Sequence, residues 1–161
     1  MNDCVVDTNV LVVANGGHAH ASAACRLASI NALRALLSEG RIAVDAAGEI
    51  LAEYKRYCNP KGQPGVGDAF FREILTNYAG KVNRIELVKR LDGTFVDFPD
   101  DADLAQFDPS DRKFVAVAVV ANAPVFNSTD RGWLRHRVAL DRNGIQIVFV
   151  CTEQQHLWEG Q

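Results

Sequence analysis

Short apolar runs alternate with longer amphipathic stretches along almost the whole chain, and this alternation is the strongest constraint on its fold. Four mostly apolar runs have the length of strands: Asp3–Val6, Ile42–Val44, Val125–Ser128 and Ile145–Val150. Helical patterns fill the segments between them: Ala19–Ser38 (one helix or two), Ala47–Tyr57, Asp68–Ala79, Asp111–Ala121 and Arg131–Leu140. Val82–Val88 suits a further strand or another helical turn. This order predicts an α/β protein with a central, mainly parallel sheet covered by helices on both faces.

The length of 161 residues suits one folding unit, so we expect a single domain over residues 1–161. Hydrophobic residues make up 48% of the chain and charged residues 23%, a balance that excludes intrinsic disorder. Asn59–Gly67 contains two Pro and three Gly and is predicted to be a surface loop within that domain. Asp92–Ser110 carries six acidic residues and no basic ones.

Charge and cysteine content bear on partners and location. The 17 basic and 20 acidic residues give a formal net charge of -3, which excludes a protein that coats nucleic acid through bulk positive charge. No apolar run approaches the ~20 residues that span a bilayer, and Met1–Asp7 lacks the basic start of a signal peptide. The four cysteines favour neither a zinc site nor a disulfide framework, and we expect Cys4 and Cys151 to be buried as small apolar residues. The sequence therefore predicts a cytoplasmic protein with no membrane partner.

Four carboxylates stand where the predicted elements begin or end. Asp7 follows the first strand and begins a predicted polar turn, Asp7–Asn9, and Asp130 follows the run Val125–Ser128. Glu53 lies on the helix after the second strand, and Asp111 begins a strongly apolar helix. Because ligands of open α/β sheets bind at the carboxyl ends of the strands, these acids can converge there. Crowded carboxylates repel one another unless a cation neutralises them, and oxygen ligands suit Mg²⁺ or Mn²⁺.

Each acid also has a purely structural interpretation. In the DPSD segment, Asp108 can cap a helix that starts with Pro109, with Asp111 as an acid of its first turn. Asp7 and Asp130 can each favour the positive end of the next helix. Glu49 and Glu53 can form a solvated helix face, and the sequence leaves open which of the two is the functional acid.

Four segments in this order form a recognisable set: VVDTNVLV (Val5–Val12), EILAEY (Glu49–Tyr54), DPSDRKFVAVAV (Asp108–Val119) and VFNSTDRGWL (Val125–Leu134). Together they resemble the motifs of PIN-domain ribonucleases, and the final run IQIVFV suits the last strand of that family. The resemblance implies a three-layer α/β/α sandwich and the metal-dependent hydrolysis of RNA phosphodiester bonds by an endoribonuclease that uses Mg²⁺ or Mn²⁺. Stand-alone proteins of this size in the family resemble VapC-type toxins. That likeness implies a small antitoxin partner and is compatible with a homodimer, and a role in host RNA maturation fits equally well.

The resemblance assigns roles by position. Asp7 and Asp130 match direct metal ligands, Asp111 matches a ligand that acts directly or through water, and Glu53 matches an acid that holds or deprotonates the attacking water. Other polar residues of the motifs are expected on the substrate side: Asn9, Ser128, Thr129, Arg112 and Arg131. One departure matters, because Gly132 stands where many members of the family have a further Asp. The number of metal ions therefore stays open.

Three other functional classes are less consistent with the chain. A phosphatase of the haloacid-dehalogenase type needs a second Asp where this chain has Asn9, and a receiver domain needs an acidic pair before the first strand. The remaining alternative is a PIN-like module that binds RNA or a protein without catalysis, supported by Gly132.

Trp133 has two interpretations. It could stack on a base of the RNA, or it could be a core residue, which the apolar residues of the helix around it favour.

Overall fold

The computed structural model describes residues 2–17 and 21–152, and these residues build one five-stranded sheet around β1. The strands are β1 (Asn2–Val6), β2 (Gly40–Asp45), β3 (Val82–Ile85), β4 (Val125–Asn127) and β5 (Ile147–Phe149). They pair in the order β3-β2-β1-β4-β5, and every pairing is parallel. The predicted α/β class and parallel sheet are confirmed.

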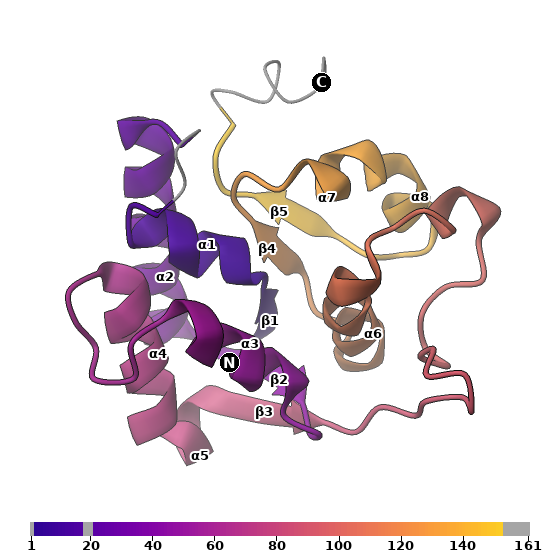
Figure 1. Cartoon of the computed structure of the whole chain (residues 1–161), viewed down its shortest axis with the longest axis horizontal. Coiled ribbons are helices and arrows are strands. Elements are labelled where there is room, and N and C mark those ends of the chain that lie inside the picture. Colours follow the sequence, from indigo (N-terminus) through magenta and orange to yellow (C-terminus); the bar gives the residue numbers. More distant parts are fainter. Residues whose placement is uncertain (1, 18–20, 153–161) are drawn as a thin grey trace.

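Helices cover both faces of this sheet. They are α1 (Thr8–Ala14), α2 (Ala23–Glu39), α3 (Glu49–Tyr57), α4 (Val66–Thr76), α5 (Tyr78–Lys81), α6 (Arg112–Ala121), α7 (Arg131–Arg135) and α8 (Arg137–Arg142). Two short 3₁₀ turns, Ala102–Leu104 and Pro109–Asp111, precede α6. In Figure 1, α1, α2 and α4 lie together on one side of the sheet, and α6, α7 and α8 lie on the other. This separation follows from right-handed crossovers, because the chain runs from β1 to β3 in one direction and returns past β1 to β5 in the other.

The first helix differs from the sequence prediction. Asp7, Thr8 and Asn9 were expected to form a polar turn, but the chain enters α1 directly after Asp7. The apolar residues that follow Asn9 explain the helix, because Val10 and Leu11 are completely buried against the rest of the core. Seven residues without a polar face give little helical periodicity, so the pattern in the sequence could not identify α1.

Other element boundaries are refined. The helix expected from Ala19 begins at Ala23 as a single helix, and its predicted first residues, 19–20, lie outside the described residues. The helix expected over Asp68–Ala79 is divided into α4 and α5, and the one expected over Arg131–Leu140 is divided at His136. Of the segment Val82–Val88, residues up to Ile85 form a strand.

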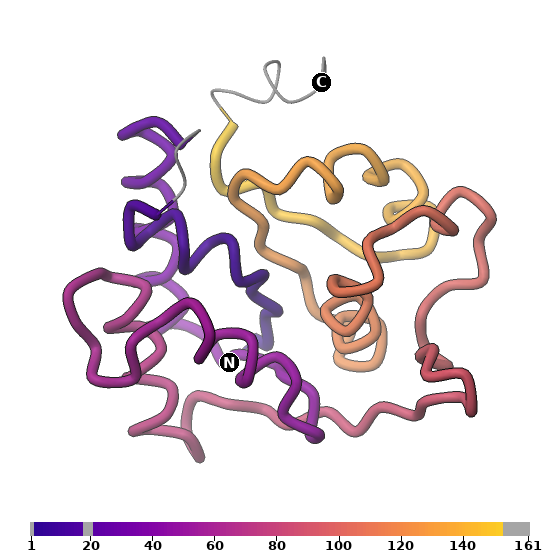
Figure 2. The backbone as a smooth tube through the Cα atoms, in the orientation of Figure 1, coloured from indigo at the N-terminus to yellow at the C-terminus, as the bar shows by residue number. Residues whose placement is uncertain are grey.

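Two long connections lie between the regular elements, one between α3 and α4 and one between β3 and α6. The predicted surface loop 59–67 is confirmed over residues 59–65 as a connection between α3 and α4, because α4 already begins at Val66. The Asp68 carboxylate accepts hydrogen bonds from the backbone N–H groups of Asn59 (2.7 Å) and Gly65 (2.8 Å). The acidic segment after β3 runs along the outside of the molecule before it reaches α6, as Figure 2 shows. The side chain of Arg112, the first residue of α6, contacts this segment: it donates to the carbonyls of Ala105 and Phe107 and lies over the ring of Phe98.

The cysteine prediction needs a correction. Cys151 is buried as expected, but it forms a disulfide with Cys25 of α2, 126 residues away, with their Cα atoms 4.9 Å apart. Sequence spacing could not reveal this pair, because it depends on the packing of the segment after β5 against the start of α2. Cys4 and Cys58 are buried free thiols. No helix among residues 2–17 and 21–152 is long and apolar enough to cross a membrane.

Candidate metal centre

Asp7 and Asp130 reach the same place from neighbouring strands. β1 pairs with β2 on one side and with β4 on the other, so the sheet order reverses between β1 and β4. Asp7 follows β1 and caps α1, and Asp130 follows β4 and caps α7, where it accepts the N–H of Gly132 at 2.8 Å. Both acids therefore lie at the positive end of the next helix, as their structural interpretation from the sequence had it. Their position at the switch point is also the place where open α/β sheets bind ligands.

The side chain of Asp111, in contrast, makes no capping hydrogen bond. The cap of the turn that begins at Pro109 is Asp108, whose carboxylate accepts the backbone N–H and the hydroxyl of Ser110 at 2.9 Å each. Asp111 is 8% exposed, and its carboxylate has no hydrogen-bond donor among the described residues. One of its oxygens instead lies in a group with oxygens of Asp7 and Asp130, all within 4.8 Å of one another. The sequence interpretation of this turn is therefore confirmed, with Asp108 as its cap and Asp111 as an acid of its first turn, but the side chain of Asp111 makes no capping hydrogen bond and its carboxylate faces two other acids.

Helix α3 supplies Glu53 to the same cavity. The carboxylate of Asp45, at the end of β2, accepts the N–H groups of Glu49 and Ile50 at 2.8 Å each and so fixes the start of α3. Further along this helix, the Tyr54 hydroxyl donates to the carbonyl of Val6, next to Asp7. Held at both points, α3 buries Glu53 in the wall of the cavity.

The structure distinguishes the two glutamates that the sequence left open. Glu53 lines a cavity of about 240 Å³ that also contains the three aspartates. Glu49 lies outside it and pairs with Lys89 at 2.6 Å, with both side chains about 40% exposed. Glu49 is therefore the solvated acid of α3, and Glu53 is the acid of the cavity.

Burial and mutual repulsion shift the proton affinity of this cluster. Burial, followed by the charge of Asp130, raises the pKa of Asp7 to about 7, although hydrogen bonds from Trp133 and Asn9 oppose the shift. Burial, followed by the charges of Asp7 and Asp130, raises the pKa of Asp111 to about 9. In the absence of a cation, the cluster therefore retains protons near neutral pH. Strongly perturbed acids in a cavity are typical of functional sites.

Asp7 is held by two side chains. The indole N–H of Trp133 and the side-chain amide of Asn9 (2.7 Å) both donate to Oδ2 of Asp7. Trp133 is completely buried, with its ring 5.0 Å from that of Phe107, so the core interpretation of Trp133 is confirmed. Its additional role as a donor to Asp7 escaped the sequence analysis, since the indole lies 126 residues from Asp7 along the chain.

The residues expected on the substrate side fall into two groups. Three are engaged with the protein. Asn9 accepts the N–H groups of Ser128 and Thr129, the fully buried Ser128 hydroxyl pairs with that of Ser29 at 2.9 Å, and the Arg112 side chain is bound to loop carbonyls as described above. The other two are Thr129, whose buried hydroxyl has no partner among the described residues, and Arg131, which directly follows Asp130 and is half-buried. Substrate binding by these five residues stays a prediction.

The three aspartates fit a divalent ion. In an octahedral shell with oxygens 2.0–2.1 Å from Mg²⁺, adjacent ligand oxygens lie about 2.9 Å apart and opposite ones about 4.2 Å apart. The three carboxylate oxygens lie within 4.8 Å of one another, so movements of about 1 Å by each would bring them into one such shell. Carboxylates are the ligands that Mg²⁺ and Mn²⁺ prefer, and a cation would also relieve their repulsion.

Comparisons with known proteins give little further guidance. No protein-family model matches the chain, and no curated protein matches it. Among solved structures, a similar chain occurs in the crystal structure of VapBC2 from Rickettsia felis bound to a DNA fragment from the promoter. The similarity covers 91% of this chain and 98% of that one, at 15% identity and a TM-score of 0.45. A likeness this distant indicates neither fold nor function, and the α/β architecture is shown by the strand pairing itself.

Proposed function

We propose that this protein is a divalent-metal-dependent endoribonuclease of the PIN type, in which Asp7, Asp111 and Asp130 hold Mg²⁺ or Mn²⁺. The observation that carries the proposal is the buried carboxylate of Asp111, which has no hydrogen-bond donor within residues 2–17 and 21–152 and faces two further carboxylates. A structural acid in such a place would be expected to have hydrogen-bond donors, because burying an unpartnered carboxylate is costly. The RNA substrate follows from the sequence resemblance to PIN-domain ribonucleases.

The residues around the cluster have distinct roles in this proposal. When bound, the ion would supply Lewis-acid chemistry, which polarises the phosphodiester and promotes attack by water. Trp133 and Asn9 orient Asp7, and the N–H of Gly132 orients Asp130. Glu53 accepts one hydrogen bond on each carboxylate oxygen, from Thr8 and from Lys113. We therefore assign Glu53 the role of positioning these two side chains at the wall of the cavity.

A second, more basic cavity adjoins the acidic one and suits a nucleic-acid backbone. It has a volume of about 430 Å³ and shares Ser110 with the acidic cavity. Three basic residues, Arg56, Lys89 and Lys113, line it together with one acid, Glu49, the partner of Lys89. Tyr57, at the end of α3, lines the acidic cavity with 59% of its surface exposed. We propose that phosphates of a single-stranded RNA occupy the basic cavity while a base stacks on Tyr57.

An RNase assay with Mn²⁺ tests this function. We expect Asp7→Asn to reduce the rate of RNA cleavage by at least ~100-fold, because the amide removes a ligand charge from the centre of the cluster. Asp103→Asn, at an exposed acid outside the cavity, is the matched control and should retain wild-type activity. Equal activity of wild type and Asp7→Asn would disprove the proposed site. An inactive wild-type protein that still binds RNA would favour the non-catalytic module that Gly132 suggested.

The resemblance to VapC-type toxins extends this proposal to a biological role. A toxin of this type would be neutralised by a small antitoxin protein, so growth arrest on expression, abolished by Asp7→Asn, is the expected result. Growth that is unaffected by an active enzyme would favour RNA maturation instead.

A further inference from the structure

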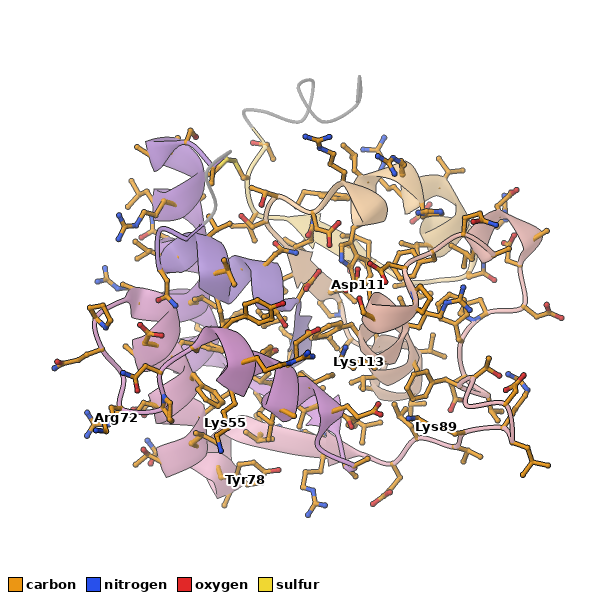
Figure 3. The ribbon with its side chains drawn as sticks, in the orientation of Figure 1. Lys55, Arg72, Tyr78, Lys89, Asp111 and Lys113 are labelled. Carbon is orange, nitrogen blue, oxygen red and sulfur yellow. A yellow bond between two sulfur atoms is a disulfide. The ribbon has the colours of Figure 1, made fainter. Side chains whose placement is uncertain are left out.

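A buried lysine lies beside the acidic cavity. Lys113, on the first turn of α6, is only 8% exposed. Its Nζ atom lies 3.3 Å from Oε1 of Glu53 and donates to the carbonyl of Ser110. Figure 3 shows Lys113 and Asp111 together at the start of α6. Because removing an ammonium group from water is costly, its burial here indicates that the neighbouring negative charge stabilises it.

Lys113 and Thr8 together bind both carboxylate oxygens of Glu53. The Thr8 hydroxyl donates to Oε2 of Glu53, and the ammonium group of Lys113 contacts Oε1. Glu53 is accordingly absent from the group of acids whose oxygens converge within 4.8 Å, which consists of Asp7, Asp111 and Asp130. Glu53 therefore lines the same cavity as the three aspartates but has its charge balanced from within the protein.

This arrangement bears on the number of metal ions. In two-metal sites the ions lie ~3.5–4 Å apart and are held by carboxylates from both sides of the pair. A second ion next to the three aspartates would need Glu53 as a ligand, since the other acid of the cavity, Asp108, is engaged in capping. Lys113 already places a positive charge on Glu53, and a divalent ion at the same carboxylate would be repelled by it.

We propose that Lys113 takes the electrostatic place of a second divalent ion and thereby limits the site to one ion, held by Asp7, Asp111 and Asp130. This inference rests on the proposed function for the presence of the first ion. Lys113 is in this view a charge-balancing residue, and its effect is seen in metal stoichiometry.

Titration calorimetry of the full chain with Mn²⁺ at constant pH tests the inference. We expect the wild type to bind one ion. Lys113→Met removes the internal cation and should raise the stoichiometry to two, with a spin-coupled electron paramagnetic resonance signal from a pair of ions ~3.5–4 Å apart. Lys113→Arg retains the charge and should keep the stoichiometry at one.

A double variant separates this mechanism from a general disturbance of the site. Glu53→Gln combined with Lys113→Met removes both members of the ion pair, so the stoichiometry should return to one. If Lys113→Met fails to fold by circular dichroism, Lys113→Gln provides the same loss of charge with a polar side chain and should also bind two ions.

The failures of the two proposals can be told apart. A wild type that binds no Mn²⁺ contradicts the proposed function and this inference with it. A wild type that binds two ions, or a folded Lys113→Met or Lys113→Gln variant that still binds one, overturns the role of Lys113 and leaves the metal-dependent function intact.

Discussion

Two groups of buried carboxylates in this molecule differ in what surrounds them. Asp45 and Asp68 are buried and accept hydrogen bonds from neighbouring groups: two backbone N–H groups for Asp45, and the Asn15 amide with two backbone N–H groups for Asp68. Asp7 and Asp111 are buried to a similar extent but face other carboxylates. Burial alone therefore does not separate structural acids from functional ones.

The difference lies in the neighbouring charges, since Asp7 also accepts hydrogen bonds, from Trp133 and Asn9, whereas Asp111 accepts none among the described residues. A carboxylate that accepts hydrogen bonds has its burial cost offset and holds a loop or helix end in place, as Asp68 does for the loop before α4. For a carboxylate that faces other acids, repulsion adds to the free-energy cost of burial, and the fold tolerates this only where another interaction compensates. For Asp7 and Asp111 the compensation that we propose is a divalent ion.

The largest effect that would sharpen this contrast is on catalysis. In Asp111→Asn we expect Mn²⁺-dependent RNA cleavage to fall by ~100-fold or more, since one ligand charge is lost. The free energy of unfolding of the metal-free variant should equal or exceed that of the wild type, because the amide relieves repulsion and desolvation. Cleavage assays and urea denaturation of metal-free protein measure the two quantities. A variant that is less stable and still fully active would place Asp111 among the structural acids.

The opposite outcome is expected at Asp68. Asp68→Asn replaces one accepting oxygen by a donor that faces N–H groups, so the free energy of unfolding should fall by ~1–2 kcal/mol. Asp68 lies outside the acidic cavity, and the cleavage rate of the folded variant should stay within about twofold of the wild type. Urea denaturation and the same cleavage assay decide the point. An unchanged stability would remove the basis for treating hydrogen-bonded and crowded acids as two classes.

The smallest effect concerns pH. The folded-state pKa values of Asp7 (about 7) and Asp111 (about 9) lie above the unfolded value of 3.8. At pH values between the unfolded pKa and these folded-state pKa values, the native state therefore binds more protons than the unfolded state. Stability from these two acids is therefore fully present below about pH 4 and is lost as pH rises through 7 and 9. We expect the melting temperature of metal-free protein to fall between pH 6 and pH 9.

Two controls accompany the pH series. Saturating Mn²⁺ should reduce the fall, because the ion replaces the protons, and the variant Asp7→Asn/Asp111→Asn should show a flatter profile. A metal-free wild type whose melting temperature rises over the same interval would show that the acids are not crowded in solution.

Much of the fold could be predicted from the sequence because strands buried on both faces are apolar throughout. The runs that became β1, β2, β4 and β5 were found in this way, and so was the order of the four acids along the chain. The helix after Asp7 was missed because its seven residues lack a polar face. The pair Cys25–Cys151 was missed because no local pattern connects cysteines 126 residues apart.

The residues that surround the acids were harder to foresee. The Trp133 indole and the Lys113 ammonium act on Asp7 and Glu53 over separations of 126 and 60 residues, and neither contact has a signature in the sequence. Conversely, Arg112 is basic and adjacent to Asp111, which suggested RNA, yet its side chain is bound to loop carbonyls. A side chain's neighbours along the chain say little about the direction in which it points.

The sequence by itself determined the α/β class and which acids stand at the ends of its elements, because both depend on local apolar patterning and on the rule that parallel strands end at one edge. Only the tertiary structure decided which of these carboxylates lacks a donor among the described residues, which glutamate enters the cavity, and that a lysine accompanies it. These features depend on the packing of α3 and α6 against β1 and β4. Packing sets the distance between charges, and that distance determines whether an acid binds a proton, a metal ion or a neighbouring side chain.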